Sequence, residues 1–170
     1  MKKFSAKEIN KAVVILCREL KKKNVSQNIY LILIAAASII VRYNLDRATS
    51  DIDIMDTGIP KQIGGLGALL SELGYHVVSD AIVNLHPDYV DRLERVAEKE
   101  NVMVLSLGPY DLAISKISRG LKRDIDDILM SDLRKELKIE VLQKLYFEAS
   151  SYWIGRPETF KSNWELFVDE

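Results

Sequence analysis

The sequence has little cysteine, no long apolar run and almost no net charge. Its single cysteine, Cys17, excludes an intramolecular disulfide framework and suits a reducing compartment. The formal charge of -1 argues against a protein that holds nucleic acid by bulk electrostatics, because such proteins are strongly basic. A local basic patch remains compatible with this balance.

Membrane and export signals are missing from the sequence as well. The most apolar run has 12 residues, from Tyr30 to Val41, and is too short to cross a bilayer. Charged residues recur through Lys23, so the beginning of the sequence lacks the pattern of a secretory signal. No repeat, low-complexity segment or Gly/Pro linker interrupts the chain. These features predict a cytoplasmic protein without a membrane segment.

Two common catalytic patterns are also absent. His76 and His86 show no metal-ligand spacing with cysteine or with another histidine, and we assign neither a role. The sequence contains no G-x-S-x-G motif of a serine nucleophile. A zinc site and a serine hydrolase are therefore not indicated.

What is present is the ordinary balance of a globular domain, with 48% hydrophobic and 29% charged residues. Hydrophobic periodicity predicts helices and strands in alternation, and a helical tail whose aromatic residues form core or a partner surface. We therefore predict the α/β (α+β) class: a small mixed sheet flanked by helices over residues 1–135, with a helical C-terminal extension, residues 136–170, packed on it. The predicted helices cover residues 5–22, 35–44, 60–73, 87–98, 109–119, 123–133 and two tail segments, the last beginning at Pro157; the predicted strands cover residues 28–34, 50–54, 75–78, 81–85 and 102–107.

The first chemical signal is the segment SDIDI, residues 50–54. Its polar and apolar residues alternate, which is the period of a strand with one buried and one open face. Asp51 and Asp53 therefore share the open face, where two carboxylates can converge on a divalent cation. Because D-x-D also occurs in solvated strands and loops, this motif needs supporting context.

The second signal lies in residues 109–129. Lys116 and Arg119 are neighbours on the surface of one predicted helix, opposite its apolar stripe, so their charges are expected to point away from the core. A short turn then brings Asp124 and Asp127 to the start of the next helix, where the helix dipole favours carboxylates. Helix capping and solvated charge explain these four residues as readily as a shared site does.

Together the two blocks resemble nucleotidyltransferase-fold proteins of the abortive-infection type IV toxin group (AbiEii-like), in particular their small relatives. That family typically carries a Gly-Gly or Gly-Ser turn after a first strand, then a helix and R-x-T-x-D-h-D, where h is apolar, and later D-L-x-x-x-K-L followed by K-D-x-x-D-h. The resemblance covers roughly residues 28 to 130. Its matching residues are Ala36, Ala37, Ser38, Arg47, Thr49, Asp51 and Asp53 in the first block and Asp111, Leu112, Lys116, Ile117, Arg123, Asp124, Asp127 and Ile128 in the second.

The resemblance implies an Mg²⁺-dependent enzyme that moves a nucleoside monophosphate from a nucleoside triphosphate to a hydroxyl of RNA or protein. In this expectation Asp51 and Asp53 hold the metal, which neutralises charge on the phosphates. Lys116 contacts phosphate, and Asp124 or Asp127 orients Lys116 or helps to position the acceptor. Arg47 is expected to reach the phosphates as a fork donor. The implied nucleotide-binding residues are Ser38, Arg47, Thr49 and Arg119. The resemblance leaves tRNA and a protein open as acceptors and an antitoxin open as a partner.

Two departures from the family pattern affect the catalytic expectation. The family's turn has glycine, which lets the backbone approach phosphates and adopt left-handed conformations, whereas this chain has alanine at residues 35–37. Many nucleotidyltransferases also place a third carboxylate on a central strand. Residues 102–107 contain no acid, and Asp80, Asp111 and Asp124 are the candidates to replace it.

Three functions remain open from the sequence. The first is an active nucleotidyltransferase that is toxin-like or modifies RNA. The second is a protein of this fold without efficient catalysis that serves as a nucleotide- or partner-binding module. The third is an unrelated α/β interaction domain with solvated charges. A cleft that receives Asp51, Asp53, Lys116 and Asp124 together would separate the first two from the third.

Overall fold

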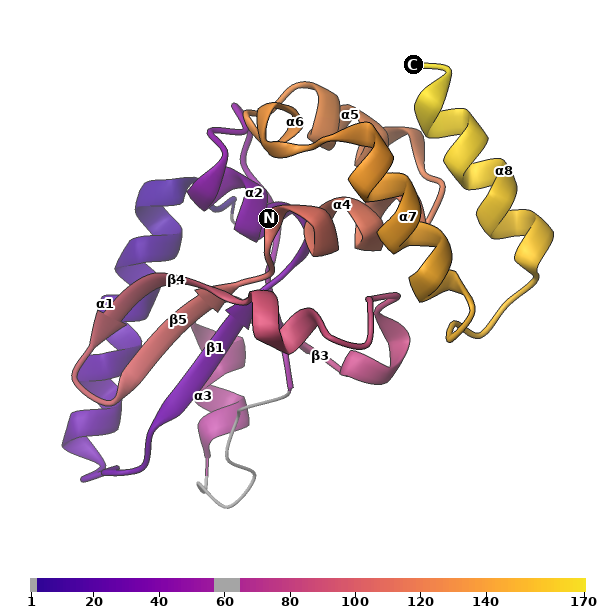
Figure 1. The fold of residues 1–170 in the computed structure, drawn as a ribbon. Helices are drawn as coiled ribbons and strands as arrows, with labels where there is room; N and C mark the ends of the chain where they lie inside the picture. Colours follow the sequence, from indigo (N-terminus) through magenta and orange to yellow (C-terminus); the bar gives the residue numbers. More distant parts are fainter. Residues whose placement is uncertain (1–2, 57–64) are drawn as a thin grey trace.

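A five-stranded mixed sheet forms the centre of the computed structural model, which describes residues 3–56 and 65–170 (Figure 1). The strand order is β3-β2-β1-β5-β4. The pairs β1–β5 and β2–β3 are parallel, and the pairs β1–β2 and β4–β5 are antiparallel. The strands are β1 (Ile29–Leu33), β2 (Ile52–Met55), β3 (Tyr75–Val78), β4 (Glu94–Lys99) and β5 (Val102–Ser106).

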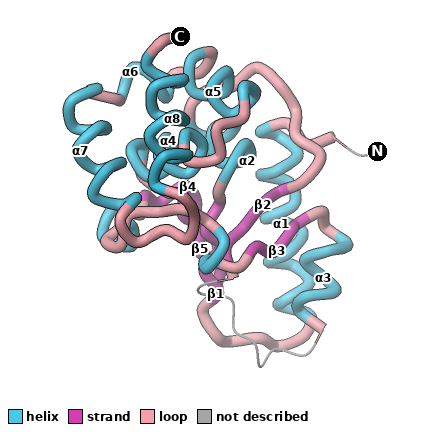
Figure 2. The backbone as a smooth tube through the Cα atoms, turned by 90° about the vertical axis from the view of Figure 1, so that its right-hand side faces the viewer, coloured by secondary structure: helices cyan, strands magenta, loops and turns pink. Residues whose placement is uncertain are grey.

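Helices cover both faces of this sheet. Figure 2 shows α1 and α3 on one side and α4, α5, α7 and α8 on the other. The predicted mixed sheet flanked by helices is therefore confirmed. None of the helices within residues 3–56 and 65–170 is long and apolar enough to cross a bilayer. The helices are α1 (Ala6–Lys22), α2 (Ala35–Arg42), α3 (Leu66–Glu72), α4 (Pro109–Ile117), α5 (Lys122–Leu129), α6 (Leu133–Glu136), α7 (Ile139–Ser150) and α8 (Pro157–Val168), with 3₁₀ turns at Asp80–Ile82 and Tyr89–Arg92.

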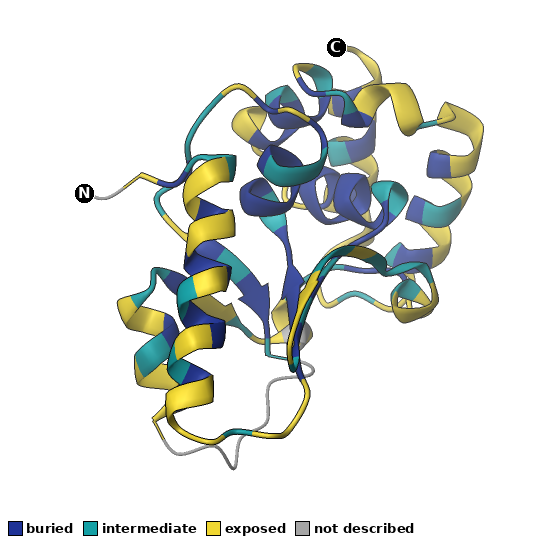
Figure 3. Cartoon of the chain, turned by 90° about the vertical axis from the view of Figure 1, so that its left-hand side faces the viewer, coloured by how far each residue is buried: buried dark blue, intermediate teal, exposed yellow. Residues whose placement is uncertain are grey.

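Helix α1 begins at a capping motif formed by Ser5 and Glu8. The Glu8 carboxylate accepts hydrogen bonds from the backbone N–H and the hydroxyl of Ser5, at 2.7 and 2.8 Å. The Ser5 side chain in turn faces the backbone N–H of Glu8, which completes a capping box. One face of α1 is buried against the sheet and the opposite face is exposed (Figure 3). The buried residues are Ile9, Ala12, Val13, Leu16, Cys17 and Leu20.

The order and register of the strands bring the turn after β1, the start of β2 and the start of β3 together at one end of the sheet. Strand β1 ends at Leu33, and α2 begins two residues later, beside the start of the antiparallel β2. The Ile34 N–H donates to the Asp53 carbonyl at 3.0 Å, which fixes this neighbourhood. In the parallel β2–β3 pair, Asp53 lies opposite His76. The turn after β1, the second aspartate of D-x-D and β3 therefore meet.

Two predicted elements are wrong. Residues 81–85 form the end of a 3₁₀ turn and a loop instead of a strand, and the predicted helix over residues 87–98 is a 3₁₀ turn followed by strand β4. The helical spacing in this segment is overridden by a hairpin, in which β4 and β5 pair through the two-residue turn Glu100–Asn101. Glu100 adopts a φ of 53° there, as such turns require.

The other predicted elements differ from the structure only in their boundaries. The predicted helix over residues 123–133 divides into α5 and α6, and only residues 66–72 of the predicted helix 60–73 appear as α3. The part of that helix before residue 65 lies outside the described residues. The remaining predicted elements agree with the structure to within a few residues.

The C-terminal helices pack through aromatic residues onto α4. Tyr146 is fully buried, and its hydroxyl donates to the Phe160 carbonyl at 2.9 Å. Its ring makes an edge contact with Trp153 and a tilted contact with Trp164, at centroid distances of 5.2 and 5.3 Å. These aromatic residues are core, as one of the two expectations had it. The division into residues 1–135 and 136–170 stays a prediction.

We predict opposite effects of alanine at two glycines in and after α3. Gly74 has a φ of +89°, and a Cβ there would clash with the Phe4 ring, so Gly74→Ala should lower the free energy of unfolding by about 2 kcal/mol. Gly67 lies in α3, and a methyl group at this position would meet no neighbouring atom of the described residues within 4 Å outside its own helix turn. Gly67→Ala should therefore raise the free energy of unfolding by up to about 1 kcal/mol. Urea denaturation of wild type and the two variants measures both changes. Equal denaturation midpoints for the three proteins would contradict both predicted effects.

Candidate active site

Two adjoining hollows open at the edge where β1 ends and β2 begins. The basic hollow, of about 260 Å³, is lined among others by Arg47, Thr49, Arg123 and Asp124. The histidine hollow, of about 520 Å³, is lined among others by His76. Both hollows share five lining residues: Ala35, Asp51, Asp53, Lys116 and Arg119. Asp51 and Asp53 therefore lie in one depression with Lys116 and Asp124.

The two aspartates of the D-x-D motif differ in their surroundings. Asp51 precedes β2, is exposed, and accepts a hydrogen bond from the Ser50 hydroxyl at 2.6 Å. Asp53 lies within β2 and is partly buried, and its Oδ1 is 3.0 Å from Nδ1 of His76. Sequence reasoning missed His76, because only the parallel register of β3 against β2 brings it beside Asp53.

A buried ammonium group holds α4 to α5. Lys116 is only 2% exposed, and its Nζ donates to Asp124 Oδ1 and to Asp127 Oδ2, both at 2.7 Å. The expectation that this charge points away from the core is therefore wrong. An ammonium ion is buried at tolerable cost only when hydrogen-bonded carboxylates compensate it, and these two aspartates do so. Arg119 is exposed, as expected, and its Nε is 3.1 Å from Asp124 Oδ2.

Arg47 joins the same cluster from the turn before β2. Its Nε and Nη2 donate to the two oxygens of Asp127, at 2.7 and 2.6 Å, in a bidentate pair. Its Nη1 is buried without a hydrogen-bond partner among the described residues. Three cations and two carboxylates thus form one connected cluster, the ion cluster: Arg47, Lys116, Arg119, Asp124 and Asp127. This excess of positive charge faces Asp51 and Asp53 across the basic hollow.

Comparison with protein-family models matches residues 11–170 to the family described as "Nucleotidyltransferase of unknown function (DUF6036)". The chain belongs to this family. A search of curated proteins and a search of solved structures each gave no match. The expected kinship with nucleotidyltransferases is confirmed, and the family description supports nucleotidyl transfer as the general activity and a nucleotide as substrate. The relationship to AbiEii-like toxins stays a prediction. The match also includes the helical tail, which the resemblance over residues 28–130 did not cover.

Of the nucleotide-binding residues expected for this nucleotidyltransferase, Thr49 and Ser38 take different positions. Thr49 lines the basic hollow, and its backbone is fixed by two hydrogen bonds with Phe4, of 2.7 and 3.1 Å. Ser38 is fully buried in α2, and its Oγ lies 2.5 Å from Oγ of Ser106 in β5. It is not among the residues that line either hollow, so its hydroxyl links α2 to the sheet.

The candidates for a third carboxylate are separated as well. Strand β5 offers only Ser106 as a polar group near this edge. Asp111 is fully buried and accepts two hydrogen bonds of 2.8 Å from Arg92, away from both hollows. Asp124 lines the basic hollow but neutralises Lys116. The side chain of Asp80 lies outside the described part of the structure.

The first residue of the alanine turn adopts a left-handed backbone conformation, which glycine takes more readily than alanine. Ala35, the first residue of α2, has a φ of 52°, in the left-handed region that costs an L-residue about 1 kcal/mol. Its side chain lines both hollows. The turn therefore keeps the glycine-like backbone and adds a methyl group at the site. The N-terminus of α2, whose first-turn N–H groups have no partner within the helix, begins beside the basic hollow.

The donor set fits Mg²⁺ that arrives with a nucleotide. Within residues 3–56 and 65–170, no group of three or more His, Cys, Asp or Glu side chains is arranged to hold a metal ion. Asp51 and Asp53 supply a pair of carboxylates at the hollows. Because Mg²⁺ is commonly held by one or two carboxylates while substrate phosphates and water complete its shell, this pair suffices, whereas a resident structural metal would need more ligands.

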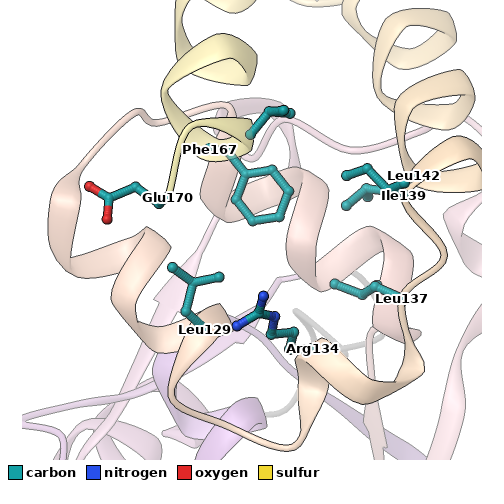
Figure 4. Close-up of a pocket in the computed structure, with 8 residues that line it drawn as sticks. Leu129, Arg134, Leu137, Ile139, Leu142, Phe167 and Glu170 are labelled. Atoms are coloured by element: carbon teal, nitrogen blue, oxygen red, sulfur yellow. The ribbon is translucent and has the colours of Figure 1, made fainter.

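Another hollow, of about 280 Å³, lies among α5, α6, α7 and α8 (Figure 4). Its apolar side chains gather around the ring of Phe167, and Arg134 and Glu170 lie on its rim. It offers one cation and one carboxylate, without a pair of acids that could hold a metal ion. The hollows at Asp51 and Asp53 are therefore the better match to phosphate chemistry. The full lining is Leu129, Arg134, Leu137, Ile139, Leu142, Phe167, Val168 and Glu170.

We predict that Asp127 makes stability depend on acid pH. Burial raises the pKa of Asp127, but hydrogen bonds from Arg47 and Lys116 outweigh burial and hold the pKa below its ordinary value of 3.8. Its contribution is therefore complete above about pH 4 and is lost as the pH falls through the lowered pKa. Asp127→Asn should cost about 3 kcal/mol of unfolding free energy at pH 7, and this difference from wild type should shrink below about pH 4.

The matched control is Asp126→Asn, in the same helix. Asp126 is partly exposed and is 3.6 Å from Lys122, so its loss should cost below about 1 kcal/mol at any pH. Urea denaturation of the three proteins between about pH 3 and pH 7 tests the assignment. A cost for Asp127→Asn that stays constant over this whole range would show that ionisation of this carboxyl does not hold the ion cluster together.

Proposed function

We propose that this protein is an Mg²⁺-dependent nucleotidyltransferase that joins a nucleoside monophosphate to an acceptor hydroxyl. One observation carries the proposal: the carboxylates of Asp51 and Asp53 line the same two hollows as Lys116 and Arg119. Acids that can hold a divalent cation and cations that can hold phosphate are thereby within one depression. Family membership supports the same reaction class.

The basic hollow is the better place for the triphosphate. Arg119 and Arg123 are exposed there, and Lys116 uses two of its three N–H donors on aspartates, which leaves one for a phosphate oxygen. Arg47 lines the same hollow, and its unpartnered Nη1 would be satisfied by a phosphate oxygen. The N-terminus of α2 adds the positive end of a helix dipole. In this arrangement Asp124 and Asp127 position Lys116.

The proposed reaction is a displacement at the α-phosphorus of a nucleoside triphosphate. The acceptor oxygen forms a bond to this phosphorus, the bond to the bridging oxygen breaks, pyrophosphate leaves, and the hydroxyl proton passes to solvent. Asp51 and Asp53 would hold Mg²⁺, which when bound neutralises charge on the phosphates and on the leaving pyrophosphate. The residues of the basic hollow orient the triphosphate so that the acceptor approaches in line.

A second candidate is a nucleotide- or partner-binding module without efficient catalysis. The methyl group of Ala35 in both hollows favours it, as does the absence of an acidic residue from β5. We also propose, from the resemblance and the single cysteine, a cytoplasmic protein related to AbiEii-like toxins, with tRNA or a protein as acceptor and with an antitoxin as partner.

Removal of the D-x-D carboxylates should abolish transfer without unfolding the protein. The double variant Asp51→Asn, Asp53→Asn should lower label transfer at least about 100-fold, because the two carboxylates that would hold Mg²⁺ against the phosphates are lost. Each α-labelled nucleoside triphosphate is offered with Mg²⁺ to the purified protein, with bulk tRNA and total cell protein as acceptors. Asp46→Asn, a change of an exposed acid outside both hollows, is the control and should transfer as wild type does.

The outcomes of this experiment separate the two candidates. Transfer that disappears in the double variant alone supports the enzyme and identifies its nucleotide. Metal-dependent binding of a nucleotide without transfer to either acceptor supports the binding module. Transfer that persists in the double variant would contradict the assignment of the site, and failure of all four nucleotides to bind would contradict both candidates.

A further inference from the structure

A fourth hollow continues from the histidine hollow toward the C-terminal helices. It has a volume of about 680 Å³, and we name it the aromatic hollow. It shares Ile82, Val83 and Asn84 with the histidine hollow, so the two form one continuous surface. Its other lining residues come from the two 3₁₀ turns, the loop between them and the α7–α8 connection, and they include Tyr89, Tyr152, Trp153 and Ile154.

A hydrogen bond joins the two segments that form the aromatic hollow, and large side chains are exposed at its rim. The Trp153 indole N–H donates to the Leu85 carbonyl at 2.9 Å and so ties the α7–α8 connection to the loop of residues 83–88. At the rim, Ile82 is 75%, Tyr152 72% and Ile154 93% exposed. Three large apolar side chains gathered around one hollow are typical of a surface that a partner covers.

Charge decides which kind of acceptor fits. None of the described residues that line the aromatic hollow is a lysine or an arginine, whereas four cationic residues line the basic hollow. Two acidic groups lie close to its His86: Asp88 and Glu148 are each 3.8 Å from the imidazole. An RNA acceptor would bring phosphates onto this surface and would need cations there. A polypeptide segment brings an uncharged backbone and apolar side chains.

We propose that the aromatic hollow binds an apolar side chain of a protein acceptor, so that a nearby serine, threonine or tyrosine hydroxyl reaches the histidine hollow. This inference rests on the proposed function and selects protein over RNA as the acceptor. The hydroxyl oxygen forms the new bond to the α-phosphorus, the bond to pyrophosphate breaks, and the hydroxyl proton passes to solvent. The product is a phosphodiester between the protein side chain and the nucleoside.

The test compares Ile154→Asp with Met130→Asp. Both residues are large, apolar and highly exposed, so neither change should unfold the protein, but only Ile154 lines the aromatic hollow. The α-labelled nucleotide is offered with RNase-treated total cell protein or with protease-treated bulk RNA. Wild type and Met130→Asp should label protein and leave RNA unlabelled. Ile154→Asp should label protein about tenfold less, because a carboxylate opposes apolar contact.

Nucleotide affinity, measured calorimetrically, should be the same in all three proteins, since Ile154 and Met130 line neither the basic nor the histidine hollow. The inference is overturned if RNA alone is labelled, or if Ile154→Asp labels protein as wild type does. In both cases the proposed nucleotidyltransferase survives. Nucleotide binding without transfer to either protein or RNA overturns the inference and leaves the binding module. Absence of nucleotide binding in wild type overturns the proposed function together with this inference.

Discussion

The buried ion pair between Lys116 and its two aspartates is the interaction on which the site depends. An ammonium ion loses its hydration when buried, and here two carboxylates at 2.7 Å replace the water. Asp127 also receives both fork donors of Arg47. One cluster therefore fixes α4, α5 and the turn before β2 relative to one another. Because that turn leads directly into Asp51 and Asp53, the geometry of the phosphate-binding side follows from the pairing of charges in the core.

In this arrangement, Arg47 and Lys116 have contacts that differ from those that the resemblance implies. Arg47 is expected there to extend its fork to phosphate, but two of its nitrogens are bound to Asp127 and only Nη1 is left. Lys116 is held in place before any substrate arrives, which is the preorganisation that electrostatic stabilisation of a transition state needs. In the proposed function, the remaining phosphate contacts would come from Arg119 and Arg123, which are exposed and line the basic hollow.

Much of this could be predicted from local sequence. The helix over residues 5–22, the strand over residues 28–34 and the alternation in SDIDI each show in the pattern of neighbouring residues, and the structure agrees with them. Strand β4 could not be predicted in this way, because its pairing with β5 in a hairpin overrides the helical spacing of its apolar residues. Neither could the position of His76 beside Asp53, which depends on strand register, nor the burial of Lys116, whose partners come from the next helix. Charge pairs across elements leave no periodic trace in a sequence.

The most direct test of the central claim, that the acids and the ion cluster form one nucleotide site, is a crystal structure with Mn²⁺ and a non-hydrolysable nucleoside triphosphate. Anomalous scattering from Mn²⁺ locates the metal independently of the nucleotide. The account predicts an anomalous peak against the carboxylates of Asp51 and Asp53, with the triphosphate running into the basic hollow toward Lys116 and Arg119. A metal and a triphosphate bound at any other place, such as the hollow around Phe167, would contradict it.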